Sequence, residues 1–251
     1  SFIQPTSDSS SEIAFGSGPA SPSFRLPGKM DSLGPTRQPE FEFASDAPFT
    51  WSVWIQGDAR GAIFSKMNED ADYRGMDGLI LADGRLKIHL IHQWPQNAIA
   101  VISKPALRAG QWNCVTVTYD GQSEAAGLHV YLDGQAVETE VEHDSLNGVL
   151  ATDVPFKIGQ RSKSEFLNGE LADFRIYASQ LSPEEVLAMI RQTLAAHYQA
   201  LQLAGAATET LTITSNYARF LDDNPVRQRA GALQSEYDQQ LAKSQTTMIM
   251  R

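Results

Sequence analysis

The residues best suited to contact a ligand lie in two neighbouring segments of the chain. Tyr73 and Arg74 follow an acidic stretch, and a second group lies in or just after an alternating apolar segment. Aromatic rings stack on the C–H faces of sugars, whereas guanidinium and amide groups hydrogen bond to hydroxyls. We therefore predict one shallow rim or face that binds a glycan. Its expected members are Tyr73, Arg74, His89, Gln93 and Trp94.

Alternation in residues 85–94 predicts how these side chains divide between two faces of one strand. His89 and His92 are three positions apart, so they lie on opposite faces and cannot chelate one metal ion together unless the strand is broken there. We expect His89 to lie with Lys87 and Gln93 on a ligand-binding face; the alternative is one histidine in the core or at an edge and one on the surface. The predicted core face carries Leu86, Ile88, Leu90, His92 and Trp94, and the other face carries Lys87, His89, Ile91 and Gln93.

Asp72 and Asp77 belong to an acidic stretch that begins at Asn68. Hard oxygen donors suit Ca²⁺, although the glycine of this stretch comes too late for an EF-hand loop. A solvated acidic loop is the alternative interpretation. In a purely structural version of this region, Trp94 caps the core and Arg74 pairs with Asp77.

Motifs for catalysis are weak. Glycoside hydrolysis on a sandwich of this kind needs two carboxylates on the same face of one strand. The nearest runs, at residues 40–42 and 138–142, lack the Asp of a Glu-x-Asp-x-Glu strand motif. There is no Gly-x-Ser-x-Gly sequence. Cys114 lies among Val and Thr, as a small buried residue would. The sequence therefore predicts a protein that is not an enzyme.

Composition excludes several classes of function. The 251 residues include 20 Lys and Arg against 30 Asp and Glu, a net charge of −10, whereas duplex nucleic acid attracts clustered cations. No apolar run approaches the length of a membrane span. One cysteine rules out an internal disulfide framework and a multi-cysteine zinc site. We expect no nucleic acid partner and no membrane insertion.

The elements that must position these residues are strands. Short β-rich runs fill residues 41–181, and Asp-Gly dipeptides between them, as at 83–84 and 133–134, indicate tight hairpins. Residues 1–40 read as a lead-in with first strands at 11–15 and 23–26. Residues 182–251 read as a helical appendage that opens on a capping box, with a second helix from residue 223. The missing initial Met leads us to expect a piece of a larger protein, with an absent downstream domain after the appendage.

Several motifs occur together in the order of one known family. They are residues 49–55 (FTWSVWI), 110–121 (GQWNCVTVTYDG), 130–134 (VYLDG), 158–159 (IG), 166–177 (FLNGELADFRIY) and 181–186 (LSPEEV). The chain thereby resembles the laminin-G-like, concanavalin-A-like jelly roll. The resemblance implies an all-β antiparallel jelly-roll sandwich with a C-terminal α-helical appendage. It also implies Ca²⁺ at a sandwich rim, with Asp173 joining Asp72 and Asp77 as ligands.

A closer resemblance covers nearly the whole chain. Residues 65–67 (SKM), 73–77 (YRGMD) and 89–98 (HLIHQWPQNA) are similar to the jelly roll inserted in large c-type cytochrome proteins of planctomycetes and related bacteria. This implies an exported parent protein, periplasmic or at the cell surface, in which the insert is a non-catalytic, carbohydrate-binding module. The alternative is a structural spacer or interaction domain that packs against neighbouring domains of the parent without a free ligand.

Overall fold

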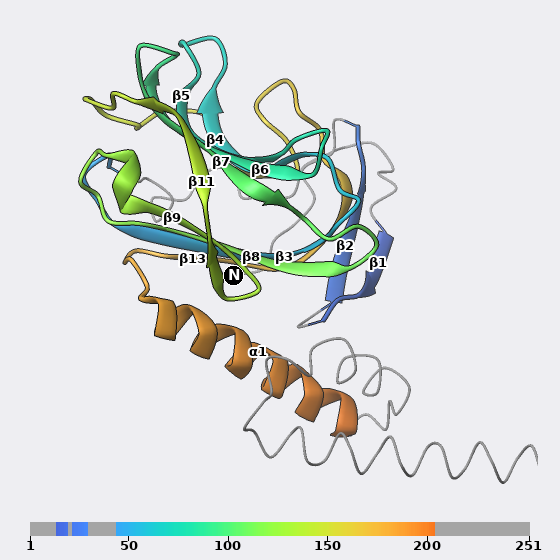
Figure 1. Ribbon diagram of the computed structural model, residues 1–251. Helices are drawn as coiled ribbons and strands as arrows, with labels where there is room; N and C mark the ends of the chain where they lie inside the picture. Colours follow the sequence, from blue (N-terminus) through green and yellow to red (C-terminus); the bar gives the residue numbers. More distant parts are fainter. Residues whose placement is uncertain (1–13, 20–21, 30–43, 204–251) are drawn as a thin grey trace, which may run out of the picture. The chain divides into compact units, whose positions relative to one another are not determined.

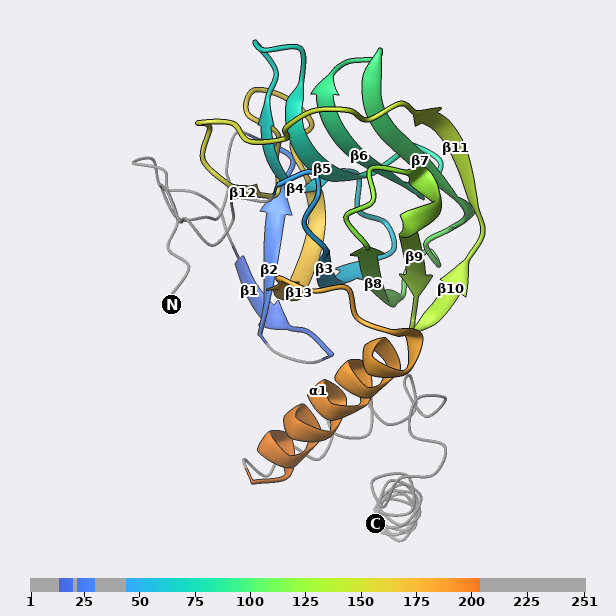
Figure 2. The ribbon, with the colours of Figure 1, turned by 90° about the vertical axis from the view of Figure 1, so that its left-hand side faces the viewer.

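Two antiparallel sheets make up most of the computed structural model, which describes residues 14–19, 22–29 and 44–203 (Figures 1 and 2). The seven-stranded sheet has the order β1 (Ala14–Ser17), β2 (Pro22–Pro27), β13 (Asn168–Tyr177), β3 (Phe49–Gln56), β8 (Trp112–Tyr119), β9 (Leu128–Leu132) and β10 (Gln135–Val137). The six-stranded sheet has the order β11 (Thr139–Asp144), β7 (Asn97–Ala106), β6 (Arg85–Gln93), β5 (Arg74–Ile80), β4 (Gly61–Asn68) and β12 (Lys157–Ile158).

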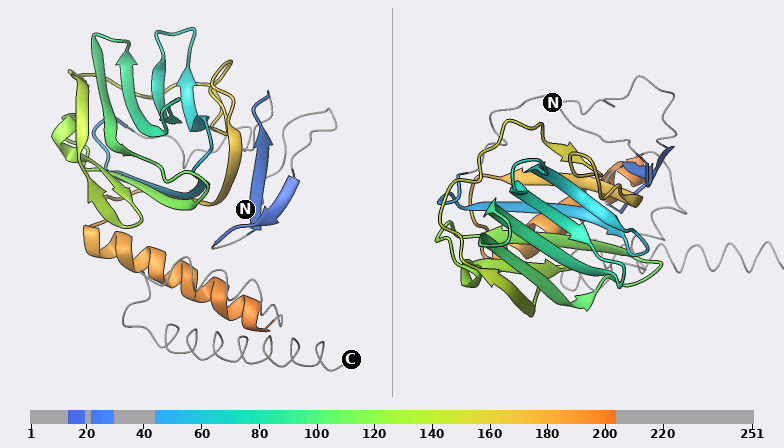
Figure 3. Two further views of the ribbon diagram at one scale, coloured as in Figure 1. Left: turned by 45° about the vertical axis from the view of Figure 1, so that its right-hand side comes forward. Right: turned by 90° about the horizontal axis from the view of Figure 1, so that it is seen from above.

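The two sheets lie one over the other, as the view from above shows (Figure 3, right). A short 3₁₀ helix, η2 (Ala125–Gly127), precedes β9, and one α-helix, α1 (Pro183–Leu203), follows the strands. The predicted all-β antiparallel jelly-roll sandwich with a C-terminal helix is therefore confirmed.

The core lies between the inner faces of the sheets. Trp51 of β3 meets Phe64 of β4 edge to face, with their ring centroids 5.0 Å apart. Phe156 stacks on Phe64 with a centroid distance of 5.5 Å. Aromatic pairs in this arrangement stabilise beyond their burial alone. The period of two in β6 puts Leu86, Ile88 and Leu90 in this core, fully buried, as the alternation predicts.

Trp94 does not follow that alternation. The pairing of β6 with β7 shifts register between Ile91 and Gln93, and a shift of one residue moves the following side chain to the other face. Trp94 therefore packs with Met67, Ile91 and Ala98, outside the main core. The prediction that Trp94 shares a face with Leu86 is wrong for this reason.

The hairpin turns form where the Asp-Gly dipeptides predict them. Gly84 and Gly134 both have positive φ, 85° and 78°, which glycine adopts without a steric penalty. The first turn joins β5 to β6 and fixes their register, in which Asp77 lies opposite His89. This pairing sets the geometry of the site described below.

The lead-in contributes strands to the sheet. The strand expected at residues 23–26 lies within β2, which pairs along β13, and β1 pairs with β2. The expected strand at 11–15 overlaps β1 at Ala14 and Phe15, and residues 11–13 lie outside the described part of the chain.

Helix α1 begins with the predicted capping box. Ser182 N donates to Glu185 Oε2 at 2.8 Å, and Glu185 N donates to Ser182 Oγ at 3.3 Å. The second helix expected from residue 223 lies outside the described residues. Within the described part of the chain, no helix is both long and apolar enough to span a membrane.

Leu90→Ala tests the assignment of the inner face. Leu90 is fully buried, so removing its side chain should lower the free energy of unfolding by about 2–5 kcal/mol. Val141→Ala is the matched control, because Val141 is 55% exposed and its loss should change stability by about 0.5 kcal/mol or less. Urea unfolding measures both variants, and equal effects would contradict the assignment.

Candidate functional site

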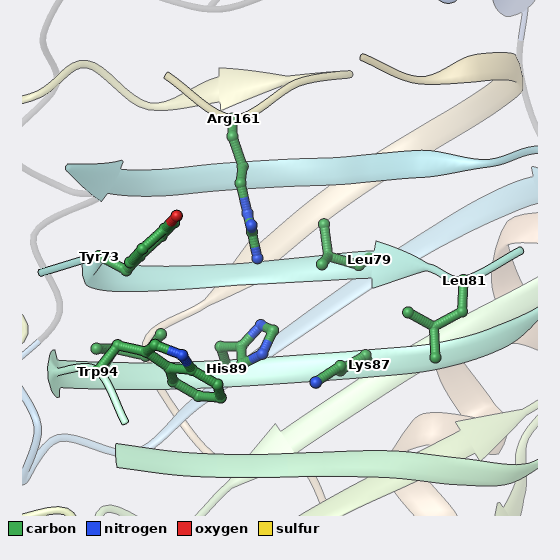
Figure 4. Close-up of a pocket in the computed structure, with 8 residues that line it drawn as sticks. Tyr73, Leu79, Leu81, Lys87, His89, Trp94 and Arg161 are labelled. Atoms are coloured by element: carbon green, nitrogen blue, oxygen red, sulfur yellow. The ribbon is translucent and has the colours of Figure 1, made fainter. Parts of the chain in front are cut away.

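A cavity of about 390 Å³ lies on the outer face of the six-stranded sheet (Figure 4). Its volume falls in the range of small-ligand pockets. β6 supplies its central row, because the side chains that alternate with the core residues of this strand point outward. The lining residues are Tyr73, Leu79, Leu81, Lys87, His89, Ile91, Trp94 and Arg161.

Beneath the floor of the cavity lies a buried carboxylate, Asp77, between two basic side chains that line the cavity. Asp77 Oδ1 lies 2.8 Å from His89 Nδ1, and Arg161 Nε donates to Asp77 Oδ2 at 2.5 Å. The side chain of Asp77 has no exposed surface, and that of Arg161 is 12% exposed. Asp77 and His89 meet because they are cross-strand partners, whereas Arg161 arrives from the loop after β12.

Electrostatic interactions keep Asp77 and Arg161 charged. Burial by itself raises the pKa of Asp77, but the attraction and hydrogen bond of His89, followed by those of Arg161, lower the pKa by more. Burial also acts to lower the pKa of Arg161, and the neighbouring carboxylate raises it. Because a buried ion without a partner is very unfavourable, each charge depends on the other.

Aromatic side chains stand at one end of the cavity. Trp94 is half-buried and meets the rings of His89 and His143 edge to face. The distances between the ring centroids are 5.2 Å and 4.7 Å, respectively. Tyr73 is 38% exposed, and its ring centroid lies 5.7 Å from the Arg161 guanidinium carbon. Both aromatic residues are held in place and still reach solvent.

The acidic stretch holds the loop that carries Arg161. Glu69 accepts hydrogen bonds from Ser162 Oγ at 2.7 Å, from Lys163 N at 2.5 Å and from Ser164 Oγ at 2.5 Å. Burial raises the pKa of Glu69, but these hydrogen bonds outweigh it and the pKa is lowered. Glu69 thus anchors the loop of residues 161–164 while ionised.

The structure separates the predicted site residues into two groups. Tyr73, His89 and Trp94 line the cavity together. Arg74 and Gln93 do not line it: Arg74 Nε donates to the backbone oxygen of His92 at 3.2 Å, and Gln93 is exposed. The alternative pairing of Arg74 with Asp77 is also not found.

Sequence reasoning missed Arg161, Leu79 and Leu81. The two leucines belong to the hairpin that holds Asp77, so the alternation of β5 could have indicated one of them. Arg161 lies 84 positions from its partner Asp77, and no local pattern marks it.

The structure does not bring the predicted calcium ligands together. Both oxygens of Asp77 are bound by His89 and Arg161, and Asp173 lies on β13 of the other sheet, where it accepts from Arg175 Nε at 2.9 Å. The described residues contain no group of three or more His, Cys, Asp or Glu side chains arranged to hold a metal ion. The ligand set Asp72, Asp77 and Asp173 is corrected accordingly, and calcium itself stays a prediction from the resemblance.

The carboxylates considered for hydrolysis pair with cations. Glu138, just before β11, pairs with Lys104 at 2.6 Å, and Glu140 of β11 pairs with Arg85 at 3.4 Å. The hydrogen bond from Lys104 lowers the pKa of Glu138, whereas a general acid needs a raised one. The eight lining residues include no carboxylate. Residues 40–42 lie outside the described part of the chain.

Cys114 is buried on β8, with its Sγ 3.7 Å from Ser52 Oγ. Burial raises the pKa of the thiol to about 12, so almost no reactive thiolate forms at neutral pH. Cys114 is therefore a packing residue, in agreement with its sequence context.

Asp77→Asn should lower the free energy of unfolding by about 3–5 kcal/mol at neutral pH, because it leaves the mostly buried Arg161 without its partner. The folded-state pKa of Asp77 lies below its usual value of 3.8, so its contribution is complete above that pH and disappears as the pH falls through the folded pKa. The difference between wild type and variant should therefore shrink on acidification.

Urea unfolding in steps from neutral pH downward measures this dependence. Asp70→Asn is the control, because Asp70 forms an exposed pair with Lys163 that should contribute less than about 1 kcal/mol. A difference for Asp77→Asn that stays constant as the pH falls would contradict the assignment.

Among solved structures, the fold is similar to toxin binding domains. The binding domain of Paraclostridial Mosquitocidal Protein 1 matches with a TM-score of 0.54 and 17% identity, over 74% of this chain and 46% of that chain. A structure of botulinum neurotoxin type C, whose cell entry depends on two ganglioside molecules, matches with a TM-score of 0.53 and 14% identity. The match covers 76% of this chain and 46% of that chain. The binding domain of botulinum neurotoxin DC, in complex with rat synaptotagmin II, matches with a TM-score of 0.54 and 13% identity. The match covers 76% of this chain and 47% of that chain.

These identities indicate a shared fold alone, and this chain spans about half the length of the matched structures. No curated protein matches the chain in sequence. A family model, in contrast, matches residues 34–187, which is more than half of the chain and includes every residue that lines the cavity. On this evidence the chain belongs to the concanavalin A-like lectin/glucanases superfamily, as a laminin-G-like domain.

Proposed function

We propose that this domain is a non-catalytic module that recognises a glycan in the cavity on the outer face of the six-stranded sheet. The observation that carries the proposal is a cavity with Tyr73 and Trp94 at one end and His89 and Arg161 at its floor. Aromatic faces and hydrogen-bonding groups together are what recognition of a sugar ring requires.

The buried ion pair supports a functional role for this face. An ion pair in a low-dielectric environment stabilises a fold little more than apolar residues of similar volume would. Asp77 and Arg161 nevertheless take the place that apolar residues could fill on the outward side of β5. Perturbed charged groups that line a cavity are more common at binding sites than elsewhere.

The apolar end of the cavity fits the less polar face of a sugar. Leu81 lies at the opposite end from Tyr73 and Trp94, with His89 and Arg161 between them, and Leu79 lies nearer the middle, level with Lys87 (Figure 4). A pyranose ring has both C–H faces and hydroxyl edges, so it can meet both kinds of surface. Because the lining has no carboxylate pair, binding without cleavage is the function that this chemistry supports.

Related folds support binding in general. One matched toxin structure is described with gangliosides and another with synaptotagmin, so proteins that contain this fold include binders of glycans and of proteins. A protein-binding role, as an interaction domain that packs against neighbouring domains of the parent, is therefore the second candidate. The similarity to inserts of exported cytochrome proteins supports a periplasmic or cell-surface location.

Trp94→Ala should weaken glycan binding by more than tenfold, equivalent to about 1.4 kcal/mol, because stacking depends on contact area. Its stability cost should stay below the roughly 3–5 kcal/mol of a core aromatic, since Trp94 is half-buried. A glycan array identifies the ligand, calorimetry measures its affinity, and thermal unfolding measures stability.

Trp112→Ala is the matched control, because Trp112 is also half-buried but lies on β8 of the other sheet. It should leave glycan binding unchanged. The proposal fails if the array gives no ligand, or if Trp94→Ala and Trp112→Ala bind the glycan equally well.

A further inference from the structure

We propose that the cavity selects glycans that carry a carboxylate, such as uronic or sialic acids, and that Arg161 and Lys87 bind this group. The inference rests on the proposed function and adds the chemical class of its ligand. It depends on three observations: the charges that line the cavity, the free edge of one guanidinium group, and the position of one lysine.

The charge of the cavity is opposite to that of the chain. The whole chain has a net charge of −10, yet the lining includes two permanent cations, Lys87 and Arg161, and no carboxylate. Two acids pair with these cations from outside the lining: Asp77 lies beneath the floor with no exposed surface, and Glu142 lies beside Lys87. A ligand in the cavity therefore meets the cations directly, and the low-dielectric walls strengthen that attraction.

Arg161 has hydrogen-bonding capacity left for a ligand. Its Nε donates to Asp77, and within the described part of the chain its two terminal nitrogens donate to no acceptor. A guanidinium group is planar and presents paired N–H donors that match the two oxygens of a carboxylate. Asp77 and the adjacent ring of Tyr73 fix its plane, so this edge is already oriented.

Lys87 supplies the second cation. Its Nζ lies 5.7 Å from the centroid of the Trp94 ring and 2.5 Å from Glu142 Oε2. Glu142 lies on the edge strand β11, its side chain is 36% exposed, and it does not line the cavity. A ligand carboxylate can therefore share or replace Glu142 as the partner of Lys87.

The arrangement places a carboxylate between the two ends of the cavity. Arg161 extends over β5 from one side, and Lys87 lies along β6 beside His89 (Figure 4). Tyr73 and Trp94 at one end remain available for the sugar ring. The ligand class that fits both features is a sugar whose ring carries its own carboxylate.

Calorimetry on the full chain tests the proposal with matched ligands. Oligogalacturonate is compared with its methyl ester, and sialyllactose with lactose, which separates the two sources of the carboxylate. At least one acid should bind about tenfold or more tightly than its neutral partner, and the preference should weaken as salt is added.

Equal binding of acid and neutral partner would overturn the inference and leave the proposed function intact. Binding of none of these glycans, together with an empty glycan array, would overturn both. Sulfated oligosaccharides that bind as tightly as the carboxylated ones would show that charge alone decides, and would refute the role of the planar Arg161 edge.

Variants locate the effect. Arg161→Lys keeps a cation for Asp77 but lacks the paired terminal N–H donors of the guanidinium group. Lys87→Met keeps an unbranched side chain without the charge. Each should lower the ratio of acid affinity to neutral affinity about tenfold, because the affinity for the acid falls by more than the affinity for the neutral partner. Glu142→Gln removes the competing carboxylate beside Lys87 and should tighten binding of the acid.

Lys163→Met is the matched control, because Lys163 is an exposed lysine that pairs with Asp70 outside the cavity. It should leave the preference unchanged. If Lys163→Met reduces the preference as much as Lys87→Met, the effect comes from the overall charge and the proposed site is wrong. Thermal unfolding of each variant separates lost binding from lost folding.

Discussion

The buried carboxylate of Asp77 is the constraint on which the outer face of this domain depends. A charge with no exposed surface requires opposite charges and hydrogen bonds in fixed positions. Asp77 meets this requirement with His89, through the pairing of β5 with β6, and with Arg161, through the loop after β12. One carboxylate thus joins two strands and a distant loop, and the side chains that it orders form the floor of the cavity.

One strand serves both the core and the site. The odd-numbered side chains of β6 from Lys87 to Ile91 line the cavity, and the even-numbered ones from Leu86 to Leu90 fill the core. A side chain on a packed strand loses its freedom when the protein folds, so little further ordering is needed when a ligand binds. The rigidity of the site is therefore a consequence of the packing behind it.

The sequence predicts the local features of this site and misses those set by tertiary pairing. Alternation indicates the faces of β6, but a two-residue Asp83-Gly84 turn would place Asp77 opposite Leu90. The loop has three residues, 82–84, and this puts Asp77 opposite His89 instead. The side of Trp94 could not be predicted, because a register shift between Ile91 and Gln93 reverses it. Arg161 could not be predicted either, because long-range contacts bring its loop to Asp77, namely the pairing of β12 with β4 and the hydrogen bonds to Glu69.

The acidic residues of this region act mainly within the protein. Glu69 holds the loop that bears Arg161, Asp77 orients the guanidinium group, and Glu142 pairs with Lys87. Each of these carboxylates places or balances a basic group, and none of them lines the cavity. A chain with an excess of acidic residues can therefore present a basic surface to a ligand, because the acids lie behind or beside the cations that they position. The local arrangement of charges, more than their sum, decides which ligand such a cavity attracts.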